Sequence, residues 1–143
     1  MPRLRVVLSR IAAWTAHVLA WAVGAVLVFV PTYEGVSVQP ALPGEPAGEL
    51  VRTSATLLEV NGPRVLLLLA FPVFATAAAV WGVQFAAAQE LRRRKLLLWV
   101  PAITLLAFCV VGALSVGLLY FPAALALLIA AAAAPPNTPP KPG

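Results

Sequence analysis

The sequence predicts an all-α integral membrane protein with four transmembrane helices and both termini in the cytoplasm. Of the 143 residues, 62% are hydrophobic and only 10% are charged, whereas soluble domains contain about half apolar and a quarter charged residues. Uncharged stretches reach the roughly 20 residues that a helix needs to cross a bilayer, and basic residues flank them. The expected helices cover about 11–31, 64–88, 96–113 and 118–134.

The first expected helix, 11–31, follows a basic cytoplasmic segment at 1–10. Its apolar run is longer than the roughly 7–15 residues of a signal-peptide core, and no small-residue cleavage site follows it. We therefore expect a retained transmembrane helix. It opens a single transmembrane domain, 11–134, which contains an external loop at 32–63.

The second expected helix begins after Asn61-Gly62-Pro63. Asn or Gly can cap a helix, and Pro63 fits its first turn, where no backbone donor is needed. In the external loop before it, residues 53–60 fit either a short strand or an amphipathic turn lying on the bilayer. A segment this short has too little periodicity to separate the two.

The third and fourth expected helices share the stretch 96–134, which contains no charge. As one helix it would be about 58 Å long at about 1.5 Å per residue, almost twice the hydrocarbon core. Gly112 and Gly117 are the glycines near its centre, so we expect the chain to reverse there. A bent helix in a three-span protein is the alternative. The proline-rich tail, 135–143, is expected to be disordered.

Charge sets the expected orientation. Eight basic residues are expected on one side of the membrane, in the N-terminal segment, in the basic cluster 92–95 and at Lys141. The other side receives two basic residues and four acids. Basic residues collect on the cytoplasmic side, which predicts cytoplasmic termini, and the Ala- and Arg-rich, Lys-poor composition suits a protein of the bacterial inner (plasma) membrane. Lipid head groups, rather than nucleic acid, are the expected partner of these charges. The expected cytoplasmic anchors are Arg92, Arg93, Arg94 and Lys95.

Small residues recur four apart in the first two expected helices. This spacing lets membrane helices approach closely, so it predicts association with other helices, with a membrane-protein partner or in a homo-oligomer. The residues that form the two stripes are Ala16, Ala20, Gly24, Ala78, Gly82 and Ala86.

His17 lies on one helix face with Trp14 and Trp21. An imidazole between two indoles can bind a haem, a quinone ring or a proton. It can equally form a hydrogen bond to a neighbouring helix while the tryptophans pack, and we favour this second interpretation because His17 lies less than two turns from the cytoplasmic end.

Other polar residues are weaker candidates. Gln84 is the only amide deep within an expected span, and is expected to hydrogen-bond between helices rather than to contact a substrate. Glu34, Glu59 and Asn61 flank the outer ends of the first two helices, where they could attract a cation or a partner, although a solvated role is favoured. Tyr120 is expected in the outer interfacial aromatic belt.

Several activities are excluded by residue counts. The single cysteine, Cys109, is expected to be buried, and it cannot form the pair that a thiol oxidoreductase needs. A haem bound by two histidines is excluded because the chain has one histidine. A zinc site needs three or four clustered ligands, which the chain cannot supply alone. Small proton-coupled multidrug exporters of this size depend on an acid within a span, and no expected span contains one. No catalytic residue, cofactor or metal is predicted.

Two segments carry a resemblance to a known group. Residues 57–72, LLEVNGPRVLLLLAFP, and 117–122, GLLYFP, resemble helix entries in small uncharacterised bacterial four-helix membrane proteins, a likeness that implies no activity. The expected function is that of a non-enzymatic accessory or oligomerising subunit. The alternative is a small transporter or channel component that acts as an oligomer, with Gln84, His17 and the outer acids lining a path.

Overall fold

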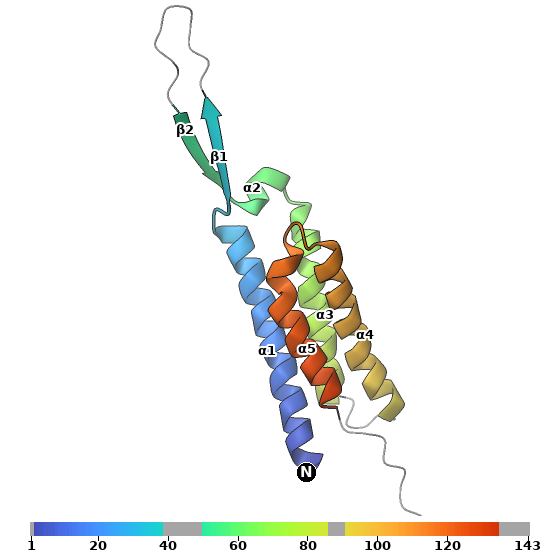
Figure 1. Cartoon of the computed structure of the whole chain (residues 1–143). Helices are drawn as coiled ribbons and strands as arrows, with labels where there is room; N and C mark the ends of the chain where they lie inside the picture. Colours follow the sequence, from blue (N-terminus) through green and yellow to red (C-terminus); the bar gives the residue numbers. More distant parts are fainter. Residues whose placement is uncertain (1, 39–49, 86–90, 135–143) are drawn as a thin grey trace, which may run out of the picture. The chain divides into compact units, whose positions relative to one another are not determined.

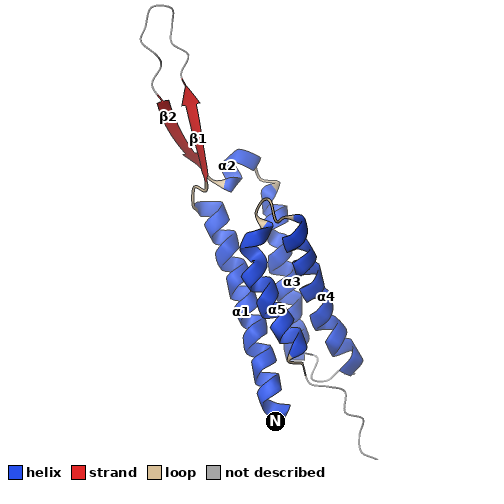
Figure 2. Ribbon diagram, viewed as in Figure 1, coloured by secondary structure: helices blue, strands red, loops and turns tan. Residues whose placement is uncertain are grey.

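The computed structural model describes residues 2–38, 50–85 and 91–134. As predicted, the chain is mostly helical, and it also contains a small two-stranded sheet in the expected external loop that the all-α prediction did not include (Figures 1 and 2). It divides into two compact units, here called the helical unit (1–23 and 70–143) and the hairpin unit (24–69). The elements in order are α1 (Pro2–Phe29), β1 (Tyr33–Val38), β2 (Leu50–Ala55), α2 (Leu57–Asn61), α3 (Val65–Phe85), α4 (Leu91–Val111), the 3-10 helix η2 (Gly117–Tyr120) and α5 (Phe121–Ala132).

Four helices surround the interior of the helical unit, each antiparallel to the next along the chain (Figure 1). The buried hydroxyl of Ser9 in α1 donates to the carbonyl of Ala130 in α5, with 2.9 Å between the oxygens. On another side, the rings of Phe71 in α3 and Phe108 in α4 lie 5.4 Å apart. α4 and α5 pack against each other. The helices therefore close into a ring in which α1 contacts both α3 and α5.

The chain reverses between α4 and α5 at the predicted glycines. The amides of Ser115 and Gly117 both donate to the carbonyl of Gly112, at 2.9 and 2.8 Å. The two glycine backbones touch, since a Cβ on Gly117 would lie only 2.6 Å from the carbonyl carbon of Gly112. The 96–134 stretch is therefore two helices rather than one bent helix.

Helices α1 and α4 start earlier than predicted. α1 begins at Pro2 instead of 11, and α4 at Leu91 instead of 96, so the basic cluster expected in a loop forms the first turn of a helix. Arginine and lysine are good helix formers, whereas the prediction followed the apolar residues alone. α4 ends at Val111, two residues early. The predicted end of the second helix at 88 and the tail 135–143 lie outside the described residues.

The hairpin unit starts with an antiparallel ladder that runs from Tyr33 opposite Ala55 to Val38 opposite Leu50. After β2, Thr56 caps α2 with a capping box. Its hydroxyl accepts from the amide of Glu59, and the Glu59 carboxylate accepts from the amide of Thr56. The ambiguous segment 53–60 is thus a strand followed by a short helix, and the box separates the two.

The predicted start of the second helix, 64, lies one residue from the start of α3, but the predicted capping of this helix by Asn61 or Gly62 is wrong. Asn61 is the last residue of α2, and Gly62 caps the C-terminal end of α2 with φ of 69°, a conformation that glycine adopts without steric cost. Pro63 lies in the following turn, and α3 begins at Val65. The segment 61–63 does lie at a helix boundary, but its first two residues end α2, and only Pro63 belongs to the turn that leads into α3.

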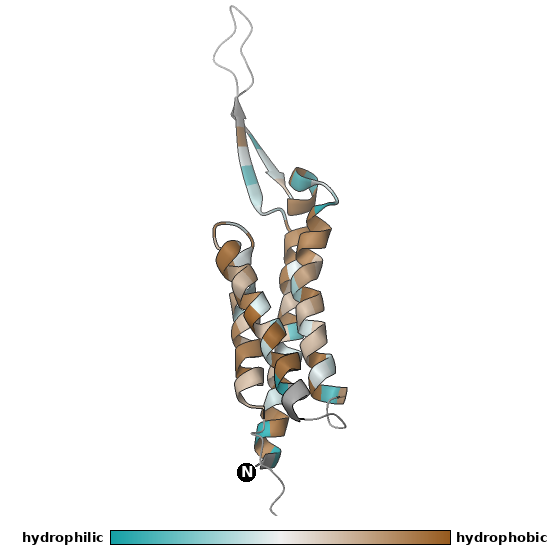
Figure 3. Ribbon diagram, turned by 90° about the vertical axis from the view of Figure 1, so that its right-hand side faces the viewer, coloured by the Kyte–Doolittle hydropathy of each residue, from teal (hydrophilic) through white to brown (hydrophobic). Residues whose placement is uncertain are grey.

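The interior of the helical unit is made largely of small side chains. Large apolar residues on the same helices point outward, among them Phe74, Trp81 and Val111, which are 72%, 64% and 88% exposed. Figure 3 shows hydrophobic residues along most of the length of the helices, with hydrophilic ones at the start of α1. Alanines that are fully buried include Ala13, Ala16, Ala20, Ala79, Ala102, Ala123, Ala124 and Ala130.

Candidate functional site

His17 is part of a hydrogen-bonded chain that joins α1 to α3. Its Nδ1 lies 3.0 Å from the Oγ1 of Thr76, and its Nε2 accepts from the indole N–H of Trp21 at 3.2 Å. Thr76 Oγ1 in turn lies 2.9 Å from the carbonyl oxygens of both Pro72 and Val73. Thr76 was not among the predicted site residues, although a lone threonine in an apolar helix is a recognisable candidate for such a bond.

These contacts assign a role to each ring nitrogen. Because Nε2 accepts, the neutral imidazole carries its hydrogen on Nδ1 and donates it to Thr76. The Thr76 hydroxyl then donates to its own helix. Both ring nitrogens therefore already have hydrogen-bond partners within the helical unit. A haem iron or a metal ion could bind His17 only by displacing Trp21 or Thr76. The geometry supports the interhelical interpretation of His17.

The two tryptophans pack around this imidazole. The ring of His17 meets Trp14 edge to face, with centroids 6.1 Å apart and planes at 74°, and meets Trp21 at 6.4 Å and 87°. Trp14 and Trp21 are 48% and 59% exposed. Their outer faces are therefore open to the surroundings of the helices while their edges hold the imidazole in place.

Gln84 does not bridge helices in the way the sequence suggested. Its side chain is exposed and lies in an open groove of about 720 Å³, whose other lining residues all come from α1, between Arg10 and Leu19. None of the hydrogen bonds between described residues uses Gln84. The groove brings an amide from the end of α3 beside a guanidinium from the start of α1.

The small-residue stripes are used mostly inside the chain. Ala16 and Ala20 are fully buried, and a Cβ on Gly82 would lie 2.9 Å from the Cβ of Leu97 in α4. Gly24 is half-buried, and Ala78 is exposed. Ala86 lies outside the described residues. Close approach of helices is therefore achieved within one chain.

The outer polar candidates have local roles in the hairpin unit. The Glu59 carboxylate completes the capping box, and hydrogen bonds from the backbone and side chain of Thr56 lower its pKa below the ordinary value of 4.5. The Asn61 amide donates to the carbonyl of Leu57 at 3.1 Å. Glu34 is exposed on β1 and lines a small pocket of about 250 Å³ together with Arg52.

Tyr120 is not in an interfacial belt, so that prediction is wrong. Its side chain is fully buried, and its ring meets Phe108 edge to face at 5.8 Å. Within the described part of the chain its hydroxyl has no hydrogen-bond partner. The residue type and its position in the sequence suited a belt, but the face on which it lies depends on η2. Cys109 is buried, as predicted.

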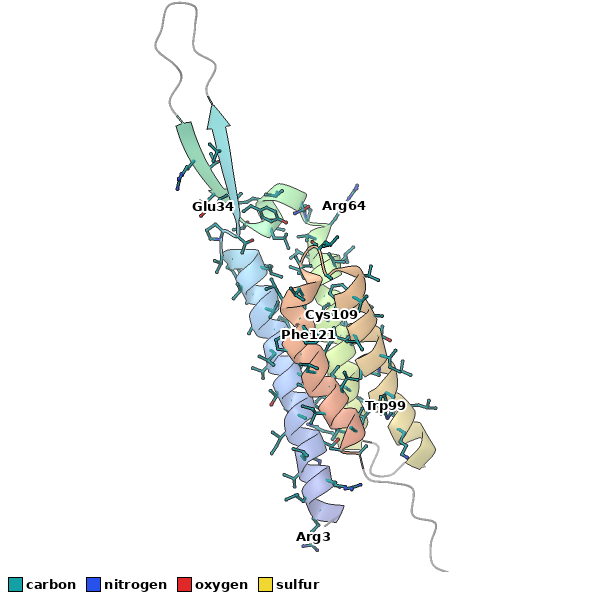
Figure 4. All side chains as sticks on the ribbon, in the orientation of Figure 1. Arg3, Glu34, Arg64, Trp99, Cys109 and Phe121 are labelled. Carbon is teal, nitrogen blue, oxygen red and sulfur yellow. The ribbon has the colours of Figure 1, made fainter. Side chains whose placement is uncertain are left out.

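The basic residues gather at the end of the helical unit where α1 and α4 begin. Figure 4 shows Arg3 and Trp99 in this half of the unit. Lys95 is half-buried, and the other predicted anchors, Arg92, Arg93 and Arg94, lie in the first turn of α4. This end combines residues from segments about eighty positions apart in the sequence.

Within residues 2–38, 50–85 and 91–134, no group of three or more His, Cys, Asp or Glu side chains could hold a metal ion. Comparison with protein-family models, curated proteins and solved structures finds no match. The resemblance of 57–72 and 117–122 to small membrane proteins therefore has no further support.

Proposed function

We propose that the chain is a multi-pass protein of the bacterial inner membrane, in which α1, α3, α4 and η2–α5 each cross the bilayer. The observation that carries this proposal is the inverted packing of the helical unit, with alanines inside and large apolar side chains outside. In water, so much contiguous apolar surface would drive aggregation. In lipid, small residues at the contacts and large ones outside suit helix packing.

The lengths of the helices support this arrangement. Segments Arg3–Phe29 and Val65–Phe85 are long and apolar enough to cross a membrane, and only 28% and 39% of their most apolar stretches are buried. A helix at the core of a soluble protein would be mostly buried. α4 is about 31 Å long, and η2 with α5 reaches about 26 Å, a shortfall that local thinning of the bilayer accommodates.

The charges support cytoplasmic termini. The helical unit, 1–23 and 70–143, contains eight basic residues and one acid, whereas the hairpin unit contains two basic residues and four acids. The basic residues of α1 and α4 share one end of the helical unit. An excess of arginine and lysine on one side of the spans marks the cytoplasmic side, which places the hairpin unit outside.

Cysteine labelling tests this topology, because the chain contains one cysteine and it is buried. In a Cys109→Ala background, Ser54→Cys in β2 and Ser115→Cys in the turn after α4 should react with an impermeant maleimide in intact cells. Asn137→Cys should react only after permeabilisation. Labelling of Asn137→Cys from outside, with Ser115→Cys unreactive, would establish three spans instead. The unmodified chain controls for reaction at Cys109.

Within the membrane, the proposed role is that of a non-enzymatic accessory subunit that presents the hairpin unit to a partner or to a second copy. The hairpin unit is the proposed contact surface because the small-residue stripes are largely unavailable to a partner. Ala16, Ala20 and Gly82 are already packed inside the chain. A two-stranded hairpin alone is marginally stable in water, so a partner would also stabilise β1 and β2.

Particle mass in mild detergent tests the role. The chain weighs 15.0 kDa, and a heavier protein particle is expected after subtraction of bound detergent. Replacement of 33–55 by a flexible linker of equal length should return the particle to one chain, while replacement of exposed Ala78 by Val should not. A monomer in every mild detergent contradicts the accessory role without contradicting the topology.

A further inference from the structure

We propose that the groove between α1 and α3 binds one anionic phospholipid, with the phosphate of the head group at Arg10 and Gln84. The inference rests on the membrane placement proposed above. The groove has a volume of about 720 Å³ and is open on one side, which suits a ligand that remains part of the bilayer.

The polar groups of the groove are those that a phosphodiester requires. Arg10 supplies a guanidinium, which donates several charge-assisted hydrogen bonds in a fixed planar arrangement. Gln84 contributes two amide donors and Trp14 an indole donor. No hydrogen bond between described residues uses any of these three side chains. They come from positions 10, 14 and 84, and only the antiparallel packing of α1 and α3 brings them to one groove.

The remaining wall of the groove is largely apolar, which favours a lipid over free phosphate. Ile11, Val18 and Leu19 continue along α1 beyond the donors, and Ile11 and Val18 are 59% and 61% exposed. An acyl chain attached to the head group contacts such a wall, whereas a free phosphate contacts only the polar donors. The donors and the apolar wall therefore match the two parts of one phospholipid.

The electrostatics of the helical unit favour an anionic head group. Its described residues contain no aspartate or glutamate, and Arg3, Arg5 and Lys95 lie at the same end as Arg10. An arginine near a membrane surface strengthens attraction to anionic lipid by roughly fivefold in binding constant. Arg10 differs from Arg3 and Arg5 because it also lines the groove, and this difference makes the inference testable.

The test uses fluorescence quenching by brominated phospholipids, since bromine quenches a tryptophan only on contact. A variant with Trp21→Phe, Trp81→Phe and Trp99→Phe keeps Trp14 as its single reporter in the groove. A second variant keeps only Trp81, which is 64% exposed on α3 and does not line the groove. Both are reconstituted in vesicles with brominated phosphatidylglycerol or brominated phosphatidylcholine at equal mole fraction.

Trp14 is expected to show about a fivefold preference for the anionic lipid in relative binding constant, and Trp81 none. Arg10→Gln should abolish the preference at Trp14, and Gln84→Leu should reduce it. Arg5→Gln, which removes the same charge from the same helix outside the groove, should preserve most of it. If the triple substitution impairs folding, Trp14→Phe alone should remove the anion-specific part of the quenching from the otherwise unmodified protein.

Several outcomes would overturn the inference. Equal quenching of Trp14 by both lipids shows a non-selective lipid contact. An equal loss with Arg5→Gln and Arg10→Gln shows diffuse attraction without a site. Trp14 protected from both lipids while Trp81 is quenched shows a groove covered by protein, such as a second copy. Relief of the quenching by millimolar inorganic phosphate shows a site for the free ion.

Failure of the membrane placement gives a different result. In that case no single-tryptophan variant is quenched by either brominated lipid, because neither reporter contacts acyl chains. Normal quenching of Trp81 together with no anionic preference at Trp14 leaves the membrane placement intact and rejects only the lipid site. The two proposals are therefore separated by one pair of proteins.

Discussion

The helical unit and the hairpin unit are each stabilised by internal contacts, and these contacts differ in how far apart their residues lie in the sequence. In the helical unit, the Ser9–Ala130 hydrogen bond joins residues 121 apart, and the His17–Thr76 bond joins residues 59 apart. In the hairpin unit, the capping box joins residues only three apart. Its two strands, β1 and β2, are consecutive in the sequence and pair with each other. One unit depends on how distant helices fit, and the other on local hydrogen bonds.

The difference shows where each unit is vulnerable. Close contacts between helices tolerate no added atoms, because rigid backbone lies on the other side. Caps and short strands can open locally without affecting the helices. We therefore expect packing substitutions in the helical unit to lower the stability of that whole unit, and substitutions in the hairpin unit to act locally.

Gly117→Ala should have the largest effect. Its new Cβ would lie 2.6 to 2.8 Å from the Cα, carbonyl carbon and oxygen of Gly112, so the turn between α4 and α5 must open. The free energy of unfolding should fall by about 3 kcal/mol, measured by denaturation with SDS in mixed micelles. Ser115→Ala, an exposed position in the same turn, is the control. Equal stability of the two variants would show that this turn is not the tight point of the unit.

Gly82→Val should have the second largest effect, because its Cβ would lie 2.9 Å from the Cβ of Leu97. Separating α3 from α4 should cost about 2 kcal/mol in the same assay. Ala78→Val adds a similar bulk one turn away on an exposed face and should be nearly neutral. If Ala78→Val is the more damaging of the two, Ala78 forms a contact with another chain.

Thr76→Val removes a hydroxyl without changing the shape of the side chain. The His17 Nδ1–H would lose its acceptor, and the expected cost is about 1 kcal/mol. Thr104→Val is a matched control, because the Thr104 hydroxyl donates only to the carbonyl of Val100 in its own helix. A double-mutant cycle of Thr76→Val with His17→Phe should show coupling, and strict additivity would argue against the bond between them.

Acidification should destabilise α2 in the hairpin unit. The pKa of Glu59 is lowered by its hydrogen bonds to Thr56, so its contribution to α2 is complete above the ordinary carboxyl pKa and is lost as the pH falls through the lowered value. The protection factors of the Val60 and Gly62 amides, corrected for the intrinsic exchange rate at each pH, should fall as the pH drops below the ordinary carboxyl pKa. Glu59→Gln, which preserves a capping-box residue, should remove most of this dependence.

The helical unit of a variant with His17→Phe and Glu90→Gln is the control for acidification, since it then contains no aspartate, glutamate or histidine. Its free energy of unfolding should stay constant over the same pH range. A parallel loss of stability in both units would show that they unfold together, and the contrast between long-range and local contacts would then fail.

Some features of the fold could be predicted from single residues. An uncharged stretch as long as 96–134 exceeds the thickness of a bilayer, so a reversal was required and only Gly112 and Gly117 lay near its centre. Thr56 and Glu59 have the spacing of a capping box, so the start of α2 could have been recognised too. It was missed because the segment was considered by periodicity alone.

The apolar stretches, the distribution of charge and the position of the chain reversal were predictable, because each depends on residues close together in the chain. Which face each helix turns inward depends on contacts between distant segments. Tyr120 became buried, Thr76 met His17, and Gln84 joined Arg10 in one groove. On helices that are apolar on every side, hydropathy distinguishes no face, and only the fit between helices selects one.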